Sequence, residues 1–213
     1  MENIKLICFD VDGTLVDGNV WWMLTKALGY PSEKIDSIFN LAKEGKISFR
    51  EGERLFAKMF QENENATKQF IKIFFESIDV KPEAKDLIAY LKPKGYIIYL
   101  ISGGIDMYVE SIARKIKADG FYANSSLEFD KKGMLQGIHY RENQKEVKAE
   151  QLQELIRKIG IDISQVVFIG DSENDIDAFK VTKHGIAVST SDEELKKVAW
   201  KSVNSLLEIK NVL

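Results

Sequence analysis

The stretch IKLICFDVDGTL, residues 4–15, places two acidic side chains where an apolar strand is expected to end. Alternate residues of an extended strand project to the same side, so the carboxylates of Asp10 and Asp12 would lie close together. At about 4 Å and an effective dielectric near 20, two such charges repel by about 4 kcal/mol. A hard divalent cation such as Mg²⁺ removes that repulsion, and the following Gly13-Thr14 turn can present backbone N–H groups to an anion.

Three further apolar runs, at 96–102, 166–171 and 185–189, also end in small or acidic residues. Strands that are apolar on both faces and alternate with helices predict an α/β fold, a Rossmann-like parallel sheet with helices on both faces. Ligands bind at the carboxyl ends of strands in such sheets, so the strand ends predict one shared site. The helical patterns between the strands span residues 82–92, 105–116, 145–159 and 174–182.

Two regions interrupt this alternation. Residues 17–80 carry four helical patterns and no strand signal, which predicts a small helical bundle inserted after the first strand. A β-hairpin is expected near residues 125–140, with its turn at 130–133. We therefore expect a core domain formed by residues 1–16 and 81–213, and an inserted helical domain formed by residues 17–80.

Composition and charge argue against several classes of protein. The chain has 213 residues with 30 basic and 33 acidic side chains, a net charge of −3, so we expect no nucleic-acid partner and no anionic membrane surface. The N-terminus does not resemble a signal peptide, and no apolar run approaches the roughly 18 residues of a membrane span. We expect a cytoplasmic protein, in which the single cysteine, Cys8, is a buried and unreactive thiol.

The second strand end carries Ser102-Gly103-Gly104, where a strand is expected to stop and a helix to begin. That arrangement can offer a hydroxyl and helix N-terminal amides to a phosphate. The same serine could instead be an ordinary helix N-cap.

The third strand end adds another carboxylate, because Asp171 closes the apolar run VVFIG and needs a cation or hydrogen-bond donors there. Three acidic groups at one site call for a metal ion and a basic partner. Lys148, in the first turn of the preceding helix, is a candidate for that partner, and Lys145 is its main rival. Either lysine, taken alone, could be a solvated surface group.

Taken together, these motifs resemble the haloacid dehalogenase superfamily in order and spacing. The resemblance covers the whole chain, because the helical insertion corresponds to the C1 cap domain of that superfamily. It is strongest to the phosphoserine phosphatase branch, which also has a hairpin before the motif lysine. The residues that carry it are Asp10-Val11-Asp12-Gly13-Thr14, Ser102-Gly103-Gly104, Lys148 and Gly170-Asp171-Ser172-Glu173-Asn174-Asp175.

The resemblance implies a Mg²⁺-dependent phosphomonoester hydrolase that acts on a small phosphorylated metabolite. Asp10 would be the nucleophile that forms an aspartyl-phosphate, and Asp12 the general acid and base. Mg²⁺ would bind Asp10, the backbone carbonyl of Asp12, and Asp171. Asn174 and Asp175 would support the metal or the lysine from behind. The groups implied to hold the phosphate are Ser102, Gly103, Lys148 and Thr14.

The inserted helices depart from the phosphoserine phosphatase pattern. Those enzymes place a glutamate nine residues after the nucleophile for the ammonium group of the substrate, and this chain has Asn19. They place an arginine on a cap helix for the carboxylate, where an ungapped match puts Phe56, with Arg54 nearby. Trp21 and Trp22 are either cap core or part of the substrate entrance. We therefore expect a leaving group that need not be serine.

Two alternatives to a phosphatase remain open at this stage. A phosphosugar mutase also keeps the aspartate at the position of Asp12 and can carry a helical cap, although the hairpin and the Ser102-Gly103-Gly104 motif fit it less well. A non-catalytic binding protein on the same scaffold would typically have lost a catalytic group, and every motif position is filled in this chain.

Overall fold

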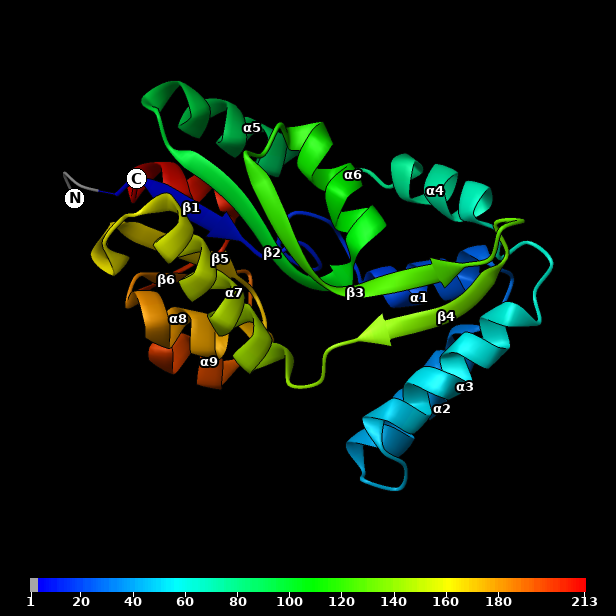
Figure 1. Ribbon diagram of the computed structural model, residues 1–213. Coiled ribbons are helices and arrows are strands. Elements are labelled where there is room, and N and C mark those ends of the chain that lie inside the picture. The colour runs from blue at the N-terminus through cyan, green and yellow to red at the C-terminus, as the bar shows by residue number, and fades with distance from the viewer. Residues whose placement is uncertain (1–3) are drawn as a thin grey trace.

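Seven strands form one sheet in the computed structural model, which describes residues 4–213 (Figure 1). Their order is β4-β3-β2-β1-β5-β6-β7, and every neighbouring pair is parallel except β3 and β4. The predicted α/β fold class is therefore confirmed. The strands are β1 (Leu6–Phe9), β2 (Ile97–Ile105), β3 (Gly120–Phe129), β4 (Leu135–Tyr140), β5 (Val166–Gly170), β6 (Gly185–Val188) and β7 (Lys201–Val203).

The central strand β1 is buried on both faces, which explains its unbroken apolar sequence. Ile7 and Phe9 join the hydrophobic core on one face, while Leu6 and Cys8 join a second core on the other, and all four are fully buried. Burial also raises the pKa of the Cys8 thiol, as expected for an unreactive cysteine. Because β1 is the fourth of the seven strands, its carboxyl end lies midway along that edge of the sheet.

Helices cover the two faces of the sheet. One face packs against α5 (Pro82–Leu91), α6 (Asp106–Ile116) and the 3₁₀ segment η4 (Leu206–Asn211). The other packs against α7 (Gln144–Ile159), α8 (Ile176–Thr182) and α9 (Glu193–Val198). Shorter 3₁₀ segments are η1 (Lys92–Lys94), η2 (Ile163–Gln165) and η3 (Glu173–Asp175).

The Ser102 motif lies inside a strand, and the expectation that the strand stops there is wrong. Strand β2 continues to Ile105, because an irregular step between Ser102 and Ile105 lets it resume pairing with Ser125 of β3. Helix α6 then begins at Asp106. The serine is therefore not a helix N-cap.

Four helices lie between β1 and α5, as the sequence predicts: α1 (Val20–Ala27), α2 (Ser32–Lys43), α3 (Phe49–Gln61) and α4 (Lys68–Ser77). Three begin at polar caps, where Asn19, Ser48 and Thr67 accept hydrogen bonds from first-turn N–H groups. Figure 1 shows α2 and α3 projecting away from the sheet beyond the β3–β4 hairpin. The division into two domains stays a prediction, and residues 1–3 of the expected core lie outside the described part.

The β3–β4 hairpin connects the sheet to these helices. Strand β4 contacts α3, and Thr67 and Met134 form an isolated β-bridge beside α4. The hairpin turn forms at Asp130, whose side chain accepts the N–H groups of Lys132 and Met134. Across residues 4–213, no helix has both the length and the apolar character needed to cross a membrane.

Candidate active site

A buried ion pair lies directly after the central strand. Asp10 is 5% exposed, and its Oδ1 lies 2.9 Å from Nζ of Lys148, a residue of α7. The same ammonium lies 2.6 Å from Oδ1 of Asp175, which is fully buried. Lys145 instead pairs with Glu173 at 3.2 Å, with its side chain 40% exposed. The structure therefore brings Lys148 to the strand ends and leaves Lys145 at the surface.

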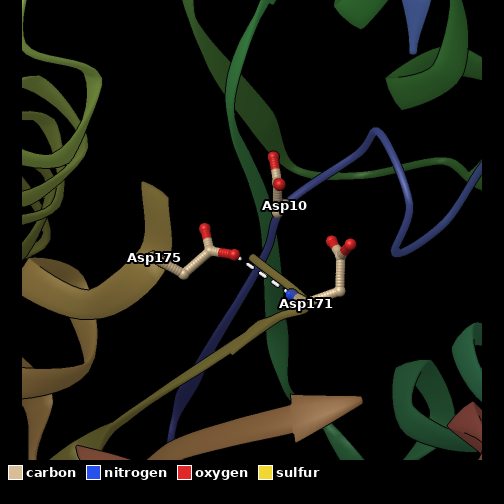
Figure 2. A group of neighbouring side chains, drawn as sticks. All are labelled: Asp10, Asp171 and Asp175. Atoms are coloured by element: carbon tan, nitrogen blue, oxygen red, sulfur yellow. Dashed lines mark hydrogen bonds between the residues drawn. The ribbon is translucent and has the colours of Figure 1, made fainter. Parts of the chain in front are cut away.

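Three carboxylates lie close together at this point, one after strand β1 and two from the segment that follows strand β5 (Figure 2). Asp10, Asp171 and Asp175 each offer an oxygen within 4.8 Å of the others. Asp175 is already engaged, because it holds Lys148 and accepts the N–H groups of Asp171 at 3.1 Å and Ser172 at 3.2 Å. Asp10 and Asp171 are thus better placed to share a cation, and oxygen ligands of this kind suit Mg²⁺.

Asp12 is not one of these three carboxylates, and its two oxygens are engaged by other partners. The strand ends at Phe9, so the alternation of side chains does not extend to Asp12. Its Oδ2 accepts the N–H of Val20 at 3.1 Å, and its Oδ1 accepts the hydroxyl of Tyr108 at 2.8 Å. Burial raises the pKa of Asp12 to about 6, with the two hydrogen bonds opposing that rise. Such a carboxyl can give and take a proton near neutral pH.

The turn after the strand is tied to the third carboxylate. Gly13 adopts a left-handed conformation, with φ at 79°, and a Cβ there would collide with the carboxylate of Asp171. The buried hydroxyl of Thr14 donates to Oδ1 of Asp171 at 2.8 Å. Lys81 donates to the carbonyl of Gly13 at 2.6 Å. Thr14, predicted to hold phosphate, therefore orients a carboxylate in this structure.

The Ser102 motif lies at the same edge of the sheet. Ser102 is 1% exposed, and its hydroxyl accepts the N–H of Gly104 at 3.0 Å. The side-chain amide of Gln144 lies directly against Gly103, where a Cβ would come within 2.5 Å of its oxygen. Gln144 in turn donates to the hydroxyl of Tyr140 at 2.5 Å.

A cavity of about 480 Å³ opens between the inserted helices and the core. Four predicted specificity residues line it: Asn19, Trp21, Trp22 and Phe56. Arg54 does not belong to this lining in the part of the chain that the structure describes, and it is exposed on α3. Asn174 also lines the cavity, from η3 on the core side.

Sequence reasoning missed three residues of this region. In the sequence, Tyr108 occupies one apolar position of a helical pattern, and nothing in that pattern indicates that its hydroxyl contacts Asp12. Lys81 precedes a helix and carries no motif. Gln144 lies four residues before Lys148, so helical spacing places it on the same face once that lysine is assigned.

Comparison with known proteins agrees with this geometry. A family model for haloacid dehalogenase-like hydrolases matches residues 4–181. A phosphoserine phosphatase of Methanocaldococcus jannaschii is 30% identical over 187 residues, covering 87% of this chain and 84% of the relative. A phosphoserine phosphatase of Lactococcus lactis is 30% identical, covering 85% and 82%.

Solved structures give the same picture. A phosphoserine phosphatase with an analogue of its phospho-aspartyl intermediate superposes with a TM-score of 0.80 at 28% identity, covering 99% of each chain. A substrate-bound phosphoserine phosphatase superposes with a TM-score of 0.80 at 26% identity, covering 100% of each chain. The resemblance predicted from the motifs is therefore confirmed.

Proposed function

The chain belongs to the haloacid dehalogenase-like hydrolases, and we propose that it hydrolyses a small phosphomonoester through an aspartyl-phosphate formed on Asp10. The observation that carries the proposal is the buried contact of Asp10 with Lys148, 2.9 Å long, at the carboxyl end of the central strand. An anionic nucleophile beside a fixed cation can receive a phosphoryl group whose negative charge that cation offsets.

In the first step, an oxygen of Asp10 attacks phosphorus while the bond from phosphorus to the alcohol oxygen breaks. Asp12 gives its proton to the departing alcohol, and its raised pKa of about 6 suits that exchange. In the second step, Asp12 takes a proton from water, which attacks phosphorus and releases Asp10 and inorganic phosphate. Tyr108 holds Asp12 in place through its 2.8 Å hydrogen bond.

The phosphate would lie between the Ser102 motif and Lys148. The Ser102 hydroxyl and the backbone at Gly103 belong to strand β2, the parallel neighbour of β1, whose end carries Asp10. Lys148 supplies positive charge as the charge on the phosphoryl oxygens redistributes. Lys145 is held by Glu173 in a surface pair, which argues against it as the phosphate ligand.

The residues fit a divalent cation, which we propose to be Mg²⁺. Asp10 and Asp171 would hold it together with the backbone carbonyl of Asp12, and Asp175 and Asn174 would support them. The donor set consists of hard oxygens, and Thr14 and Gly13 fix the orientation of Asp171. When bound, such an ion supplies positive charge that offsets the carboxylates and polarises a phosphoryl oxygen. A cytoplasmic location stays a prediction.

The test is phosphate release with Mg²⁺ from a panel of monoesters, comparing the parent with Asp10→Asn. The panel includes phosphoserine, phosphothreonine, phosphoethanolamine and sugar phosphates. Asp86→Asn is the control for the same chemical change, because that side chain is exposed on helix α5. We expect Asp10→Asn to lose about a thousandfold or more in rate and the control to stay close to the parent.

Equal activity of the two variants would overturn the assignment of the nucleophile. A rearranged phosphosugar without free phosphate would identify a mutase instead. Binding of a monoester without turnover, by parent and variant alike, would identify a non-catalytic binding protein.

A further inference from the structure

The cavity beside the candidate active site has an apolar wall built from the inserted helices. Trp21 stacks obliquely on Phe56, with ring centres 6.4 Å apart, and Trp22 meets Phe39 edge to face at 5.7 Å. Phe39 is 44% exposed and lies against the cavity, so its ring is available to a bound molecule. Ile35 of α2 also belongs to this wall, and Ile138 of strand β4 adds to it from the hairpin.

The charged groups of the lining do not suit an anion. Among the described residues, the lining holds four acidic side chains against two lysines, and no arginine. One of the two lysines, Lys145, is already paired with Glu173 at 3.2 Å. A carboxylate on the substrate would therefore find no arginine to bind both of its oxygens, and it would face a lining with net negative charge.

The cavity adjoins the groups proposed to act on phosphate. Gln144 contributes both to the lining and to the contact against Gly103. Asn174 lines the cavity from the turn that also carries Asp175. Gln144 therefore joins the strand end at Gly103 to the cavity, and we expect the ester group of a phosphate bound at Ser102 to enter the cavity beside this side chain.

We propose that this cavity binds the alcohol portion of the substrate, and that this portion is an extended apolar group without a carboxylate, such as an alkyl or arylalkyl chain. The inference rests on the proposed phosphomonoesterase function and specifies its substrate class. A volume of about 480 Å³ is in the usual range for small-molecule sites and leaves room well beyond a three-carbon amino acid. Each methylene moved from water onto such a wall is worth about fourfold in binding.

The test uses two series of matched compounds. Alkyl phosphates from ethyl to octyl are compared with phosphoserine by kcat/KM. The corresponding alkylphosphonates, which cannot be hydrolysed, are titrated by the quenching of tryptophan fluorescence. We expect both kcat/KM and affinity to rise about fourfold per methylene until the cavity is filled, and phosphoserine to fall below hexyl phosphate.

Phe39→Ala, with Leu55→Ala as its control, links that gain to the cavity. The two side chains are 44% and 41% exposed on α2 and α3, but only Phe39 lines the cavity. We expect Phe39→Ala to reduce the gain from ethyl to hexyl at least fivefold, and Leu55→Ala to leave it unchanged.

The outcomes separate this inference from the proposed function. Phosphate release that shows no dependence on chain length, or that is fastest with phosphoserine, overturns the inference and leaves the phosphatase intact. Phosphonate affinity that rises with chain length, without release from any ester, supports the cavity and overturns the phosphatase. Flat phosphonate affinity overturns the inference whether or not any ester is hydrolysed.

Discussion

Replacing Lys148 by methionine tests the buried charge cluster most directly. Lys148 is 1% exposed, and its ammonium lies 2.9 Å from Asp10 and 2.6 Å from Asp175. Methionine is similar in length and apolar, so little packing is lost, but two buried carboxylates lose their cation. Removing one partner of a buried pair typically costs about 3–5 kcal/mol, a large part of the roughly 5–15 kcal/mol that stabilises a domain.

The measurement is urea unfolding in EDTA, with Lys145→Met as the matched control. Lys145 lies on the same helix, is 40% exposed and makes one surface pair at 3.2 Å, so its loss should cost about 0–1 kcal/mol. We expect added Mg²⁺ to recover part of the loss in Lys148→Met, because a cation beside Asp10 replaces some of the missing positive charge.

The deficit of Lys148→Met should also depend on pH. Burial raises the pKa of Asp10, and the Lys148 ammonium opposes that rise, so the variant raises this pKa further. At low pH the carboxyl is protonated in the folded and the unfolded protein alike, so its raised pKa has no effect on stability. Above the pKa of about 4 that it has in the unfolded protein, the unfolded state loses the proton more readily, and the folded state becomes less stable by comparison. The deficit should therefore grow with rising pH. Losses below about 1 kcal/mol in both variants, flat with pH, would refute the reasoning.

Three other changes test the neighbouring contacts. Tyr108→Phe removes the 2.8 Å hydrogen bond to buried Asp12, and we expect urea unfolding to show a loss of about 1–3 kcal/mol and steady-state kinetics to show a lower kcat with little change in KM. Gly13→Ala forces a side chain onto φ 79° and against Asp171, and thermal unfolding should show a loss of about 1–3 kcal/mol or more. Mg²⁺ should raise the melting temperature of the parent, and Asp171→Asn should abolish most of that rise in the same thermal scans.

Each of these has an outcome that contradicts it. A Tyr108→Phe enzyme with unchanged kcat would mean that Asp12 needs no positioning by that hydroxyl. A Gly13→Ala protein as stable as the parent would mean that the turn can shift without disturbing Asp171. An equal Mg²⁺-induced rise in the parent and in Asp171→Asn would place the cation elsewhere.

The sheet could be predicted where burial on both faces leaves a mark in the sequence. Strand β1 is apolar at consecutive positions because its alternate residues feed two different cores. Strand β7 (Lys201–Val203) carries no such mark, since it is a three-residue edge strand whose first two residues are exposed. A strand this short is stabilised by pairing with its neighbour β6, and its own residues give no sign of that pairing.

The position of Ser102 shows a different limit. Two consecutive glycines after an apolar run indicate that a strand has ended, and that is a sound local rule. Here β2 resumes pairing after an irregular step, because β3 is long enough to offer Ser125 as a further partner. The length of a neighbouring strand is not a local property. The sequence therefore shows the Ser102 motif but not that it lies inside a strand.

The same limit applied to Asp12 and Thr14, because their partners Tyr108 and Asp171 lie far along the chain. The choice between Lys145 and Lys148, by contrast, was within reach of the sequence. Apolar Val147, Leu152 and Leu155 define the buried stripe of helix α7, and Lys148 falls near its centre. Lys145 lies roughly 60° around the helix from Lys148, at the edge of that stripe. A lysine buried in the middle of an apolar stripe needs a partner for its charge, and Asp10 and Asp175 supply it here.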